Sequence, residues 1–467
     1  MTLRTMLITT TALAFAGPAI AQSTEIVTSS ADAGAGSFRA ALAAVAGTGG
    51  QIVVATEGDI TIDSTLEYTG SAPLYVFGNG QTVNAAGNYT LFAATNGSGL
   101  TISDLTFAGP GGFTIENRGD LDGPAGKGIF VDVRDDQQGL VSLVLQDVTV
   151  RGVANHGIHV SDCNLADDCG GGGGGAGEGS DAGIIVQLTN VTIDDAGTGK
   201  FDADGLRVDE RGPGSILASI TGSTFVGVGA DGIELDEGQA GDVRVIMSGS
   251  RFDGNGDYCD PALLGQYMPE EDEGEFEQGA IMPADIPQKP EGTPDDGCFE
   301  YAVDTYDDGS VEEYEVAIDV DDAFDVDEAG PGSILATVSD TVILNSFDEG
   351  LDYDEEDAGD IRITLIGTSA SGNTDDGYKH SEEGEGGVYA VVVDATSNDN
   401  GGVGFVFEEE DGGDVFVSTM RVATAGNDDG ELGIEVVQDD DGTGALSAVD
   451  SDFADGVEAE GVDHSEG

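Results

Sequence analysis

Apolar residues return with a fixed period in the second half of this chain. The same pattern starts at the small residues Ala323, Gly350, Gly377 and Gly404, each 27 residues after the last, and Gly205 and Gly232 are again 27 apart. Within each repeat, apolar side chains occupy positions one and three, and again positions eleven, thirteen and fifteen. Because alternate residues of a strand face opposite sides, this spacing predicts two short strands with one buried face each.

Self-similarity at this length is typical of a solenoid. One repeat cannot bury its apolar face alone, so consecutive repeats must stack as coils, with equivalent strands parallel and about 4.8 Å apart. We therefore predict an all-β parallel β-helix of coils about 27 residues long over 50–467.

One amphipathic helix is predicted before the coils begin. Ser37 can cap its N-terminus and Gly47 can end it, and apolar residues between them recur at helical spacing. A short helix of this kind would cover the open end of the first coil, so 22–49 reads as an N-terminal cap.

The run from Thr28 to Leu42, followed by Gly-Gly-Gln-Ile-Val-Val, resembles the N-terminal cap of the pectin-lyase-like superfamily of right-handed parallel β-helices. The resemblance implies a right-handed solenoid. That superfamily includes lyases, hydrolases, adhesins and proteins without known activity, so the resemblance alone does not fix a function. It implies, for an enzyme, either a calcium-dependent uronate lyase with an Arg or Lys base or a glycosidase with paired carboxylates.

Two insertions interrupt the repeats, at about 163–183 and 256–322. The first contains a run of six glycines, and the second ends in a predicted β-hairpin, Phe299 to Ile318, that turns at Asp307-Asp308-Gly309. The tail after Gly456 is polar and is expected to fray.

Residues 1–21 have the charge, apolar core and Ala19-Ile20-Ala21 ending of a secretory signal peptide. We expect a secreted or cell-surface protein, with the periplasm as a further location, and no membrane insertion. In an exported protein, cysteines are more often disulfide-bonded than metal-bound. Four cysteines allow three connectivities, of which we favour the local pairs Cys163 with Cys169 and Cys259 with Cys298.

The formal net charge is −76, from 91 acidic and 15 basic residues. Nucleic acids and anionic membranes are polyanions bound through Lys and Arg, so this charge excludes them as direct partners. It favours divalent cations as partners, and leaves open a polysaccharide or a cell-surface partner.

An acidic pair recurs at positions four and five of the coils, where stacking should form one continuous corner. Carboxylates about 4.8 Å apart repel, and Ca²⁺ binds oxygen ligands at a compatible spacing, so we predict calcium as the cofactor. The alternative is a solvated acidic face with diffuse counterions only. The predicted ligands are Asp209, Glu210, Asp236, Glu237, Asp327, Glu328, Asp354, Glu355, Glu382, Glu408 and Glu409.

A weaker cation motif spans Asp304 to Glu315, which partly follows the spacing of an EF-hand loop; a plain hairpin explains it equally well. The catalytic residues, if any, cannot be named from the sequence. Outward basic residues exist at Arg207, Arg244, Arg362 and Lys379, but there is no Trp to stack on a sugar. His380 is predicted to pack in the core, and His156 and His159 to pack at a turn.

The favoured function is a non-catalytic, calcium-binding surface or matrix protein of adhesin type. The alternative is a lyase or glycoside hydrolase that acts on extracellular polysaccharide, and a third hypothesis is an acidic structural protein without specific sites.

Overall fold

The computed structural model describes residues 23–113, 126–162, 179–265, 272–288, 297–306, 308–318, 320–439 and 442–467. The predicted signal peptide and the pair Cys163 with Cys169 lie outside these ranges.

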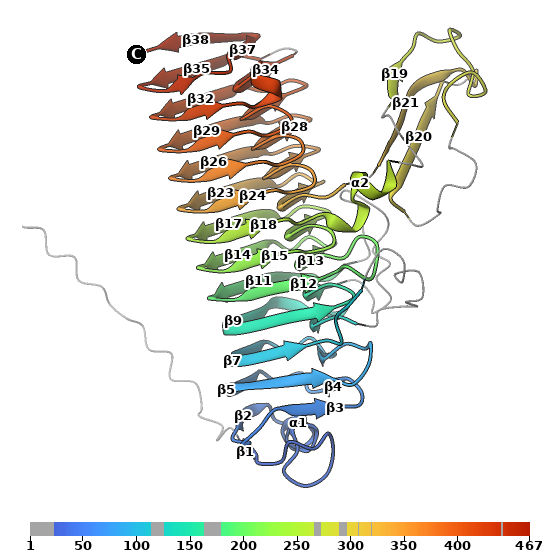
Figure 1. The fold of residues 1–467 in the computed structure, drawn as a ribbon, viewed down its shortest axis with the longest axis vertical. Helices are drawn as coiled ribbons and strands as arrows, with labels where there is room; N and C mark the ends of the chain where they lie inside the picture. The colour runs from blue at the N-terminus through green and yellow to red at the C-terminus, as the bar shows by residue number, and fades with distance from the viewer. Residues whose placement is uncertain are drawn as a thin grey trace, which may run out of the picture.

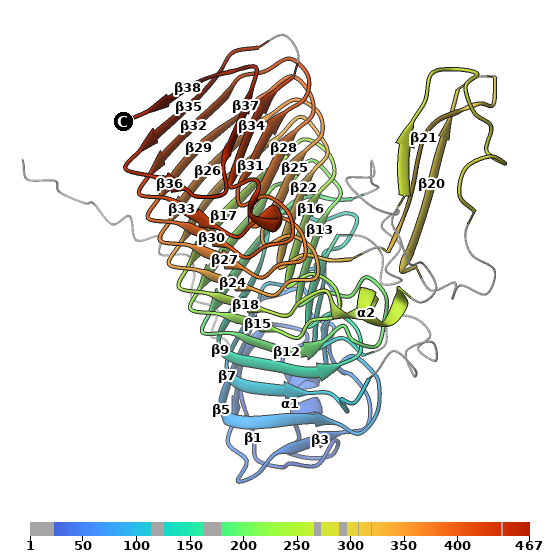
Figure 2. The same cartoon turned by 45° about the horizontal axis from the view of Figure 1, so that its top comes forward.

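The chain forms a right-handed parallel β-helix in which coils stack along one axis (Figures 1 and 2). Two long parallel sheets form its walls. Each regular coil supplies one strand to sheet B, then one longer and one shorter strand to sheet A. Sheet B consists of β4 (Leu66–Tyr68), β6 (Phe92–Ala94), β8 (Ile129–Asp132), β10 (Ile158–Ser161), β13 (Leu206–Glu210), β16 (Ile233–Glu237), β22 (Phe324–Glu328), β25 (Asp352–Glu355), β28 (Lys379–Glu382), β31 (Val406–Glu409), β34 (Ile434–Gln438) and β37 (Val457–Glu460).

Sheet A forms the opposite wall and carries the remaining strands of the coils. Its strands are β1 (Ser23–Val27), β2 (Gly50–Val54), β3 (Ile60–Ile62), β5 (Leu74–Ala85), β7 (Leu100–Ala108), β9 (Gln138–Val153), β11 (Asp181–Thr189), β12 (Thr192–Ala196), β14 (Ile216–Thr221), β15 (Thr224–Val226), β17 (Asp242–Ser248), β18 (Arg251–Asp253), β23 (Ser333–Ser339), β24 (Val342–Leu344), β26 (Asp360–Ile366), β27 (Ser369–Ser371), β29 (Gly387–Val393), β30 (Thr396–Asn398), β32 (Val415–Met420), β33 (Ala423–Ala425), β35 (Gly444–Val449), β36 (Asp452–Phe453) and β38 (Val462–Glu466).

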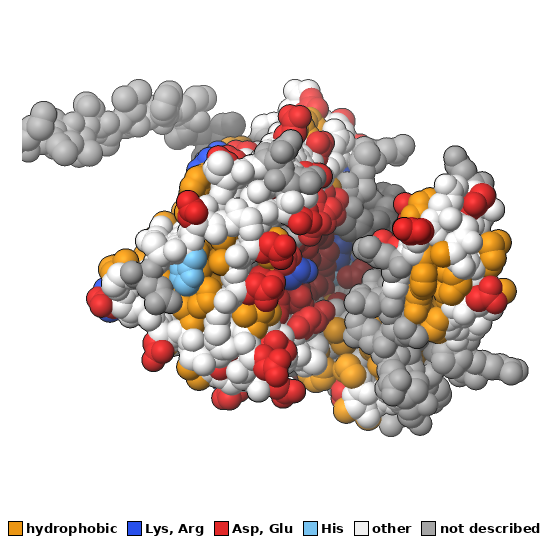
Figure 3. Space-filling view, turned by 90° about the horizontal axis from the view of Figure 1, so that it is seen from above, with side chains coloured by type: hydrophobic (Ala, Val, Ile, Leu, Met, Phe, Trp, Pro, Cys, Tyr) orange, Lys and Arg blue, Asp and Glu red, His pale blue; other side chains and the backbone are white. Residues whose placement is uncertain are grey.

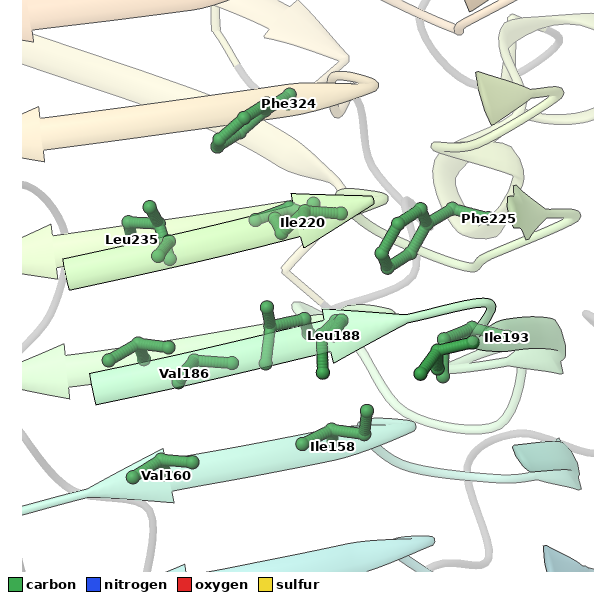
Figure 4. Close-up of a cluster of buried hydrophobic side chains, with 14 of the residues drawn as sticks. Ile158, Val160, Val186, Leu188, Ile193, Ile220, Phe225, Leu235 and Phe324 are labelled. Carbon is green, nitrogen blue, oxygen red and sulfur yellow. The ribbon is translucent and has the colours of Figure 1, made fainter. Parts of the chain in front are cut away.

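The predicted register is confirmed. Leu206 pairs with Ile233, 27 residues later, and Ile233 pairs with Phe324 across the second insertion. The alternating apolar residues point into the space between the sheets and form one continuous core (Figure 4). Aromatic rings stack from coil to coil, as in Tyr378 on Phe405 with ring centroids 4.6 Å apart.

His380 is a core residue, as predicted. It is fully buried and stacks on Phe407 at 5.0 Å. Burial lowers the pKa of His380 to about 3, so the ring is neutral at physiological pH.

Backbone contact between coils is very close at position nine, which is glycine in each regular coil. A Cβ on Gly386 would lie 1.5 Å from the carbonyl oxygen of Gly359, and a Cβ on Gly413 would lie 1.7 Å from that of Gly386. The turns from sheet B to sheet A therefore stack with no room for a side chain.

The N-terminal cap also follows the prediction. Helix α1 (Phe38–Val45) begins after Ser37, whose Oγ accepts a hydrogen bond from the N–H of Ala40 at 3.2 Å. Its buried side chains are Phe38, Ala41, Leu42 and Val45. The tail prediction is wrong: β37 pairs with β34 and β38 with β35, because backbone pairing continues although the residues are polar.

The second insertion leaves the solenoid after β18 and stands beside the sheet B side (Figures 1 and 2). It contains η2 (Asp257–Cys259), α2 (Pro261–Leu264) and an antiparallel sheet of β19 (Asp272–Glu275), β20 (Phe299–Thr305) and β21 (Val311–Ile318). The hairpin β20–β21 is confirmed; β19, a third strand, was not predicted. The segment Asp304 to Glu315 lies in this hairpin, where Asp304 pairs with Glu313, and cation binding there stays a prediction. A further short helix, η3, spans Asp428–Gly430.

Cys259 and Cys298 form the predicted disulfide, with Cα atoms 5.3 Å apart. It closes the base of the insertion, where both cysteines are fully buried in a small separate core. No helix in the described ranges is long and apolar enough to cross a membrane.

Replacing both Cys259 and Cys298 by serine should destabilise the insertion by about 2–4 kcal/mol and leave the coils folded. Limited proteolysis should then cut within 256–322, while circular dichroism keeps the strand signal of the wild type. Cleavage spread evenly over the coils would contradict this expectation.

Candidate functional site on sheet B

The acidic residues at positions four and five were predicted to form one continuous corner, and this prediction is wrong. The two residues are consecutive in a strand, so their side chains point to opposite sides. Asp209 contacts groups on the outer face of sheet B, whereas the main-chain N–H of Gly212 reaches Glu210 beneath the turn to sheet A. The predicted ligands therefore split into two separate rows.

The outer row of position four is joined on the same face by position two. Figure 3 shows acidic side chains gathered in a hollow between the solenoid and the inserted segment. The outward residues of the five central strands are Arg207 and Asp209, Glu234 and Asp236, Asp325 and Asp327, Asp352 and Asp354, and Lys379 and Ser381. We call these ten residues the sheet B face.

A buried polar network lies at the N-terminal side of this face. His159 is hydrogen-bonded through Nε2 to Asp209 Oδ2 at 2.5 Å, and its Nδ1 contacts the Lys127 ammonium. Lys127 also lies 5.1 Å from the ring of Phe130. Each of these four residues is less than a tenth exposed. His159 is therefore part of an ionic network and is not simply packed at a turn.

Arg207 is the centre of the network. Its Nε lies 2.7 Å from Asp209 Oδ1, and its guanidinium also contacts Glu234 on the next coil. Arg211, which is 1 % exposed, pairs with Asp236. Two arginines thus neutralise carboxylates on two adjacent strands.

The network separates the pKa values of its carboxyl groups. Burial would raise the pKa of Asp209, but the charges of Arg207 and His159 hold it well below the ordinary value. Burial raises the pKa of Asp236 to about 7, although Arg211 and Arg207 oppose the shift. Burial also lowers the pKa of His156, whose Nδ1 accepts a hydrogen bond from the N–H of Asp204 at 2.9 Å.

The face is more open further along, on β22, β25 and β28. Asp325, Asp327 and Asp354 are partly exposed there. Lys379 Nζ lies 3.1 Å from Asp352 Oδ2, so Asp352 is held in an ion pair. Burial raises the pKa of Asp327 to about 6, and the charge of Asp352 adds to this effect.

The pKa values of Asp354 and Lys379 are both raised, for different reasons. Burial and then the charge of Asp352 raise the pKa of Asp354 well above its ordinary value. Burial alone would lower the pKa of Lys379, but Asp352 and Asp354 raise it, so the ammonium stays charged. The charged ammonium of Lys379 thus faces a carboxyl group, that of Asp354, whose pKa is raised.

Three groups of carboxylates are close enough to share one cation, with ligand oxygens within 4.8 Å of one another. Arg207 contacts members of two groups, and Lys379 lies 3.8 Å from Glu349 in the third. Basic side chains of the protein therefore already supply positive charge at each group, and calcium at the predicted ligands stays a prediction. The groups are Asp202, Asp204 and Glu234; Glu234, Asp325 and Asp327; and Asp322, Asp348 and Glu349.

The inner row of position five forms what we call the glutamate ladder. All six of its glutamates are fully buried. Four of them, Glu210, Glu237, Glu328 and Glu409, accept hydrogen bonds from N–H groups of the turn that follows the strand, as when Gly241 donates to Glu237 Oε1 at 3.0 Å. The ladder consists of Glu210, Glu237, Glu328, Glu355, Glu382 and Glu409, paired in register along sheet B.

The other predicted residues lie elsewhere. Glu408 is on the outer side of β31, beyond the sheet B face, and is partly exposed. Arg244 and Arg362 lie on sheet A, where they pair with Asp242 and Asp360 at 2.6 Å.

A pocket of about 230 Å³ lies next to Lys127 at the N-terminal end of sheet B. Glu67, Ala93 and Phe130 line it from three adjacent strands, and three threonines complete its lining. Its lining residues are Thr65, Glu67, Thr90, Ala93, Thr95, Lys127 and Phe130.

No family model matches the chain, and no curated protein matches it in sequence. Solved structures with which it shares some similarity include three β-helix enzymes. Pectate lyase Pel9A aligns at 13 % identity and a TM-score of 0.38, over 90 % of this chain and 79 % of the lyase. The catalytic domain of a GH87 α-1,3-glucanase variant in complex with nigerose aligns at 13 % identity and a TM-score of 0.48, over 94 % and 67 %. The A-module of the Azotobacter vinelandii mannuronan C-5 epimerase AlgE6 aligns at 10 % identity and a TM-score of 0.33, over 94 % and 99 %.

Proposed function

We propose that the protein is a carbohydrate-active enzyme that hydrolyses a polysaccharide outside the cell, with its acid and base on the open part of the sheet B face. The observation that carries this proposal is the arrangement of Asp327, Asp352 and Lys379. They lie on three consecutive strands, where the ion-paired carboxylate of Asp352 lies near the carboxyl group of Asp327, whose pKa burial raises to about 6.

Glycoside hydrolysis needs one carboxyl group as general acid and one carboxylate as base or nucleophile. Asp352, ion-paired with Lys379, is suited to be the carboxylate. Asp327 is suited to be the acid, because a pKa of about 6 leaves much of it protonated in mildly acidic solution.

The spacing favours an inverting reaction. Asp327 and Asp352 are diagonal neighbours, one coil and two residues apart, so their Cα atoms are about 8 Å apart from strand geometry. Both side chains leave the same face of the sheet, so we expect their carboxyl groups to keep a similar separation. Inverting enzymes place their two carboxyl groups about 6.5–9.5 Å apart, which leaves room for the attacking water.

The charge of the face indicates the class of polymer. A uronate polymer would meet repulsion from the carboxylates on β22 and β25, so a neutral polysaccharide is the better substrate. Location outside the cell is supported by the predicted signal peptide and by the disulfide Cys259–Cys298.

Purified protein should release reducing ends from neutral glucans and none, or far fewer, from pectate and alginate. Asp327→Asn and Asp352→Asn should each lower kcat by about 10²-fold or more. Asp360→Asn, which removes a partly exposed carboxylate of sheet A, should leave the rate unchanged. Release of unsaturated ends from a uronate polymer, or full activity in both variants, would overturn the proposal.

The pH profile gives a separate check. The general acid must be protonated, so kcat/KM should fall as pH rises above about 6, the pKa of Asp327. The descending limb should be absent from the residual activity of Asp327→Asn. A rate that rises through pH 6–8 would show that Asp327 is not the acid.

A second candidate, a non-catalytic surface or matrix binding protein, is favoured by one observation on sheet A. Tyr389 and Phe416 stack at 6.1 Å on adjacent strands, and Arg362 lies 4.1 Å from the Tyr389 ring. Such a row can bind sugar rings without catalysis. Loss of polysaccharide binding in Tyr389→Ala with Phe416→Ala, in a protein without hydrolytic activity, would favour this candidate.

A further inference from the structure

We propose that the glutamate ladder is a chain of carboxyl-to-carboxylate hydrogen bonds in which every second glutamate keeps its proton in the folded protein. The solenoid would then be a fold that contains obligatory buried protons. The inference is independent of the proposed enzyme activity, because the ladder lies under the turns and not on the sheet B face.

Geometry brings the carboxyl groups together. Neighbouring glutamates pair residue to residue along sheet B, so they repeat at the strand spacing of about 4.8 Å. Asp162 occupies the same position one coil before Glu210, and Gln438 occupies it one coil after Glu409. The row therefore runs over eight consecutive coils.

The ladder lacks enough donors if every member is ionised. Glu210 Oε2 and both carboxyl oxygens of Glu355 and Glu382 are buried and have no hydrogen-bond partner. Buried acceptors without donors are costly, and facing carboxylates in a water-excluded corner also repel. A proton between two neighbours removes the repulsion and forms a strong charge-assisted hydrogen bond.

The C-terminal end of the row shows which kind of partner a ladder carboxylate takes. There, Gln438 stands where the other coils have glutamate, and its amide Nε2 donates to Glu409 Oε2 at 2.8 Å. Glu409 Oε1 accepts from the N–H of Gly413 at 2.5 Å. Glu409 is thus satisfied by N–H donors alone, and a protonated glutamate can supply the equivalent O–H donor on the earlier coils.

The N-terminal end is also an acceptor. Asp162 accepts hydrogen bonds from the N–H groups of Ser180, at 2.6 Å, and Arg211, at 2.9 Å. If Asp162 and Glu409 are acceptors, alternation makes Glu210, Glu328 and Glu382 the protonated donors and Glu237 and Glu355 the acceptors. Each protonated glutamate has one O–H group and can donate it to only one of its two ladder neighbours at a time.

The charged groups around the ladder do not replace these protons. Asp357 and Asp360 face Glu355 and Glu382, and Asp162 faces Glu210, so every such group is acidic. Within the described ranges, no Lys, Arg or His forms an ion pair with a ladder carboxylate; Arg211 contacts Asp236 instead.

The pKa values alternate in the same sense. Burial, reinforced by neighbouring carboxylates, raises the pKa of Glu210 to about 10, of Glu328 to about 11 and of Glu382 to about 9. For Glu237 and Glu355, burial raises the pKa, but hydrogen bonds from their ladder neighbours lower it.

The buried protons should make the folded protein less stable as pH rises. Unfolded glutamate loses its proton near pH 4.3, whereas the three donors keep theirs in the folded state. Between these pH values the folded state binds more protons, so stability falls as pH rises. The contribution is complete below about pH 4.3 and is lost progressively up to the folded pKa values of about 9–11.

The test compares Glu210→Gln/Glu328→Gln/Glu382→Gln with the wild type. Glutamine can donate as Gln438 does, so this variant should fold. The control Glu383→Gln/Glu385→Gln/Glu431→Gln makes the same three substitutions at exposed sites. At pH 7, unfolding of the wild type and of the control should release about three protons more than unfolding of the ladder variant. Their melting temperature should also fall more steeply between pH 5 and pH 9.

Infrared spectroscopy of the folded wild type provides a readout that does not need a variant. A carboxylic acid C=O band should persist at pH 7 and resist exchange into heavy water. Absence of this band, or equal proton release from all three proteins, would overturn the proposal. So would a chelator that lowers the melting temperature of the wild type but not of the ladder variant, because a bound cation would then occupy the ladder.

Discussion

Replacing Gly413 by alanine is expected to destabilise the solenoid by more than about 4 kcal/mol, or to prevent its folding. A Cβ at this position would lie 1.7 Å from the carbonyl oxygen of Gly386 on the preceding coil. That oxygen belongs to a turn whose two flanking strands are both paired with neighbouring coils. Neither coil can therefore move aside without losing backbone hydrogen bonds between strands.

Gly412, the preceding residue, provides the matched control. A Cβ there would meet no atom within 4 Å, and its φ lies outside the left-handed region. Gly412→Ala should leave stability unchanged or raise it by about 0.4–1 kcal/mol, because alanine restricts the unfolded chain. Urea denaturation of the two variants would measure their free energies of unfolding. Equal values would show that the close backbone contact between coils does not exclude a side chain at Gly413.

The second large effect is expected for Arg207→Gln. Its guanidinium lies 3.1 Å from Asp202 and 2.7 Å from Asp209, and it also contacts Glu234 on the next strand. Without it, buried carboxylates lose their neutralising partner, which typically costs about 3–5 kcal/mol. Arg244→Gln, which breaks a single exposed pair with Asp242, should cost less than about 1 kcal/mol.

This loss should depend on pH. The folded pKa of Asp209 is depressed by Arg207 and His159, against the opposing effect of burial. Its contribution is therefore present above the unfolded pKa of about 3.9 and disappears as pH falls through the folded value. The stability gap between the wild type and Arg207→Gln, from urea denaturation, should be large at pH 7 and shrink below about pH 4. A gap that is constant over this range would contradict an electrostatic origin.

The sequence predicts the fold well because the signal repeats. Alternation at positions one and three, and the return of the same residues after 27, fix the strands, their inward faces and their register. The helical cap is also predicted correctly, because Ser37 and four apolar residues suffice to define it. Strand β19 is missed because its sequence, Asp-Glu-Gly-Glu, has no apolar alternation and pairs through its backbone.

The site is less well predicted, for a physical reason. Acidic residues at positions four and five are adjacent in sequence but lie on opposite sides of the strand. The side chain at position four shares the outer face with the side chain at position two of the same strand. Position two is acidic in three coils, at Glu234, Asp325 and Asp352, and this pattern could have predicted the acidic face. The contacts of Lys127 and Arg211 could not be foreseen, because both residues lie in turns whose path the repeat does not determine. His159 lies on β10 and pairs in register with Arg207, so its outward position two was a signal that the sequence analysis missed.

The break between β16 and β22 has a consequence for how the solenoid folds. Elsewhere in the regular coils a strand pairs with the strand 27 residues away, but Ile233 pairs with Phe324, 91 residues away. Closing the longer loop costs only about 1 kcal/mol more in chain entropy, since the cost grows with the logarithm of loop length. During synthesis, however, the coils up to β18 emerge well before their next neighbour exists. The C-terminal edges of β16 and β17 stay unpaired while the inserted segment is synthesised, so growth of the solenoid pauses at this junction. An unpaired edge can also pair with a strand of a second chain, so mispairing is easiest here.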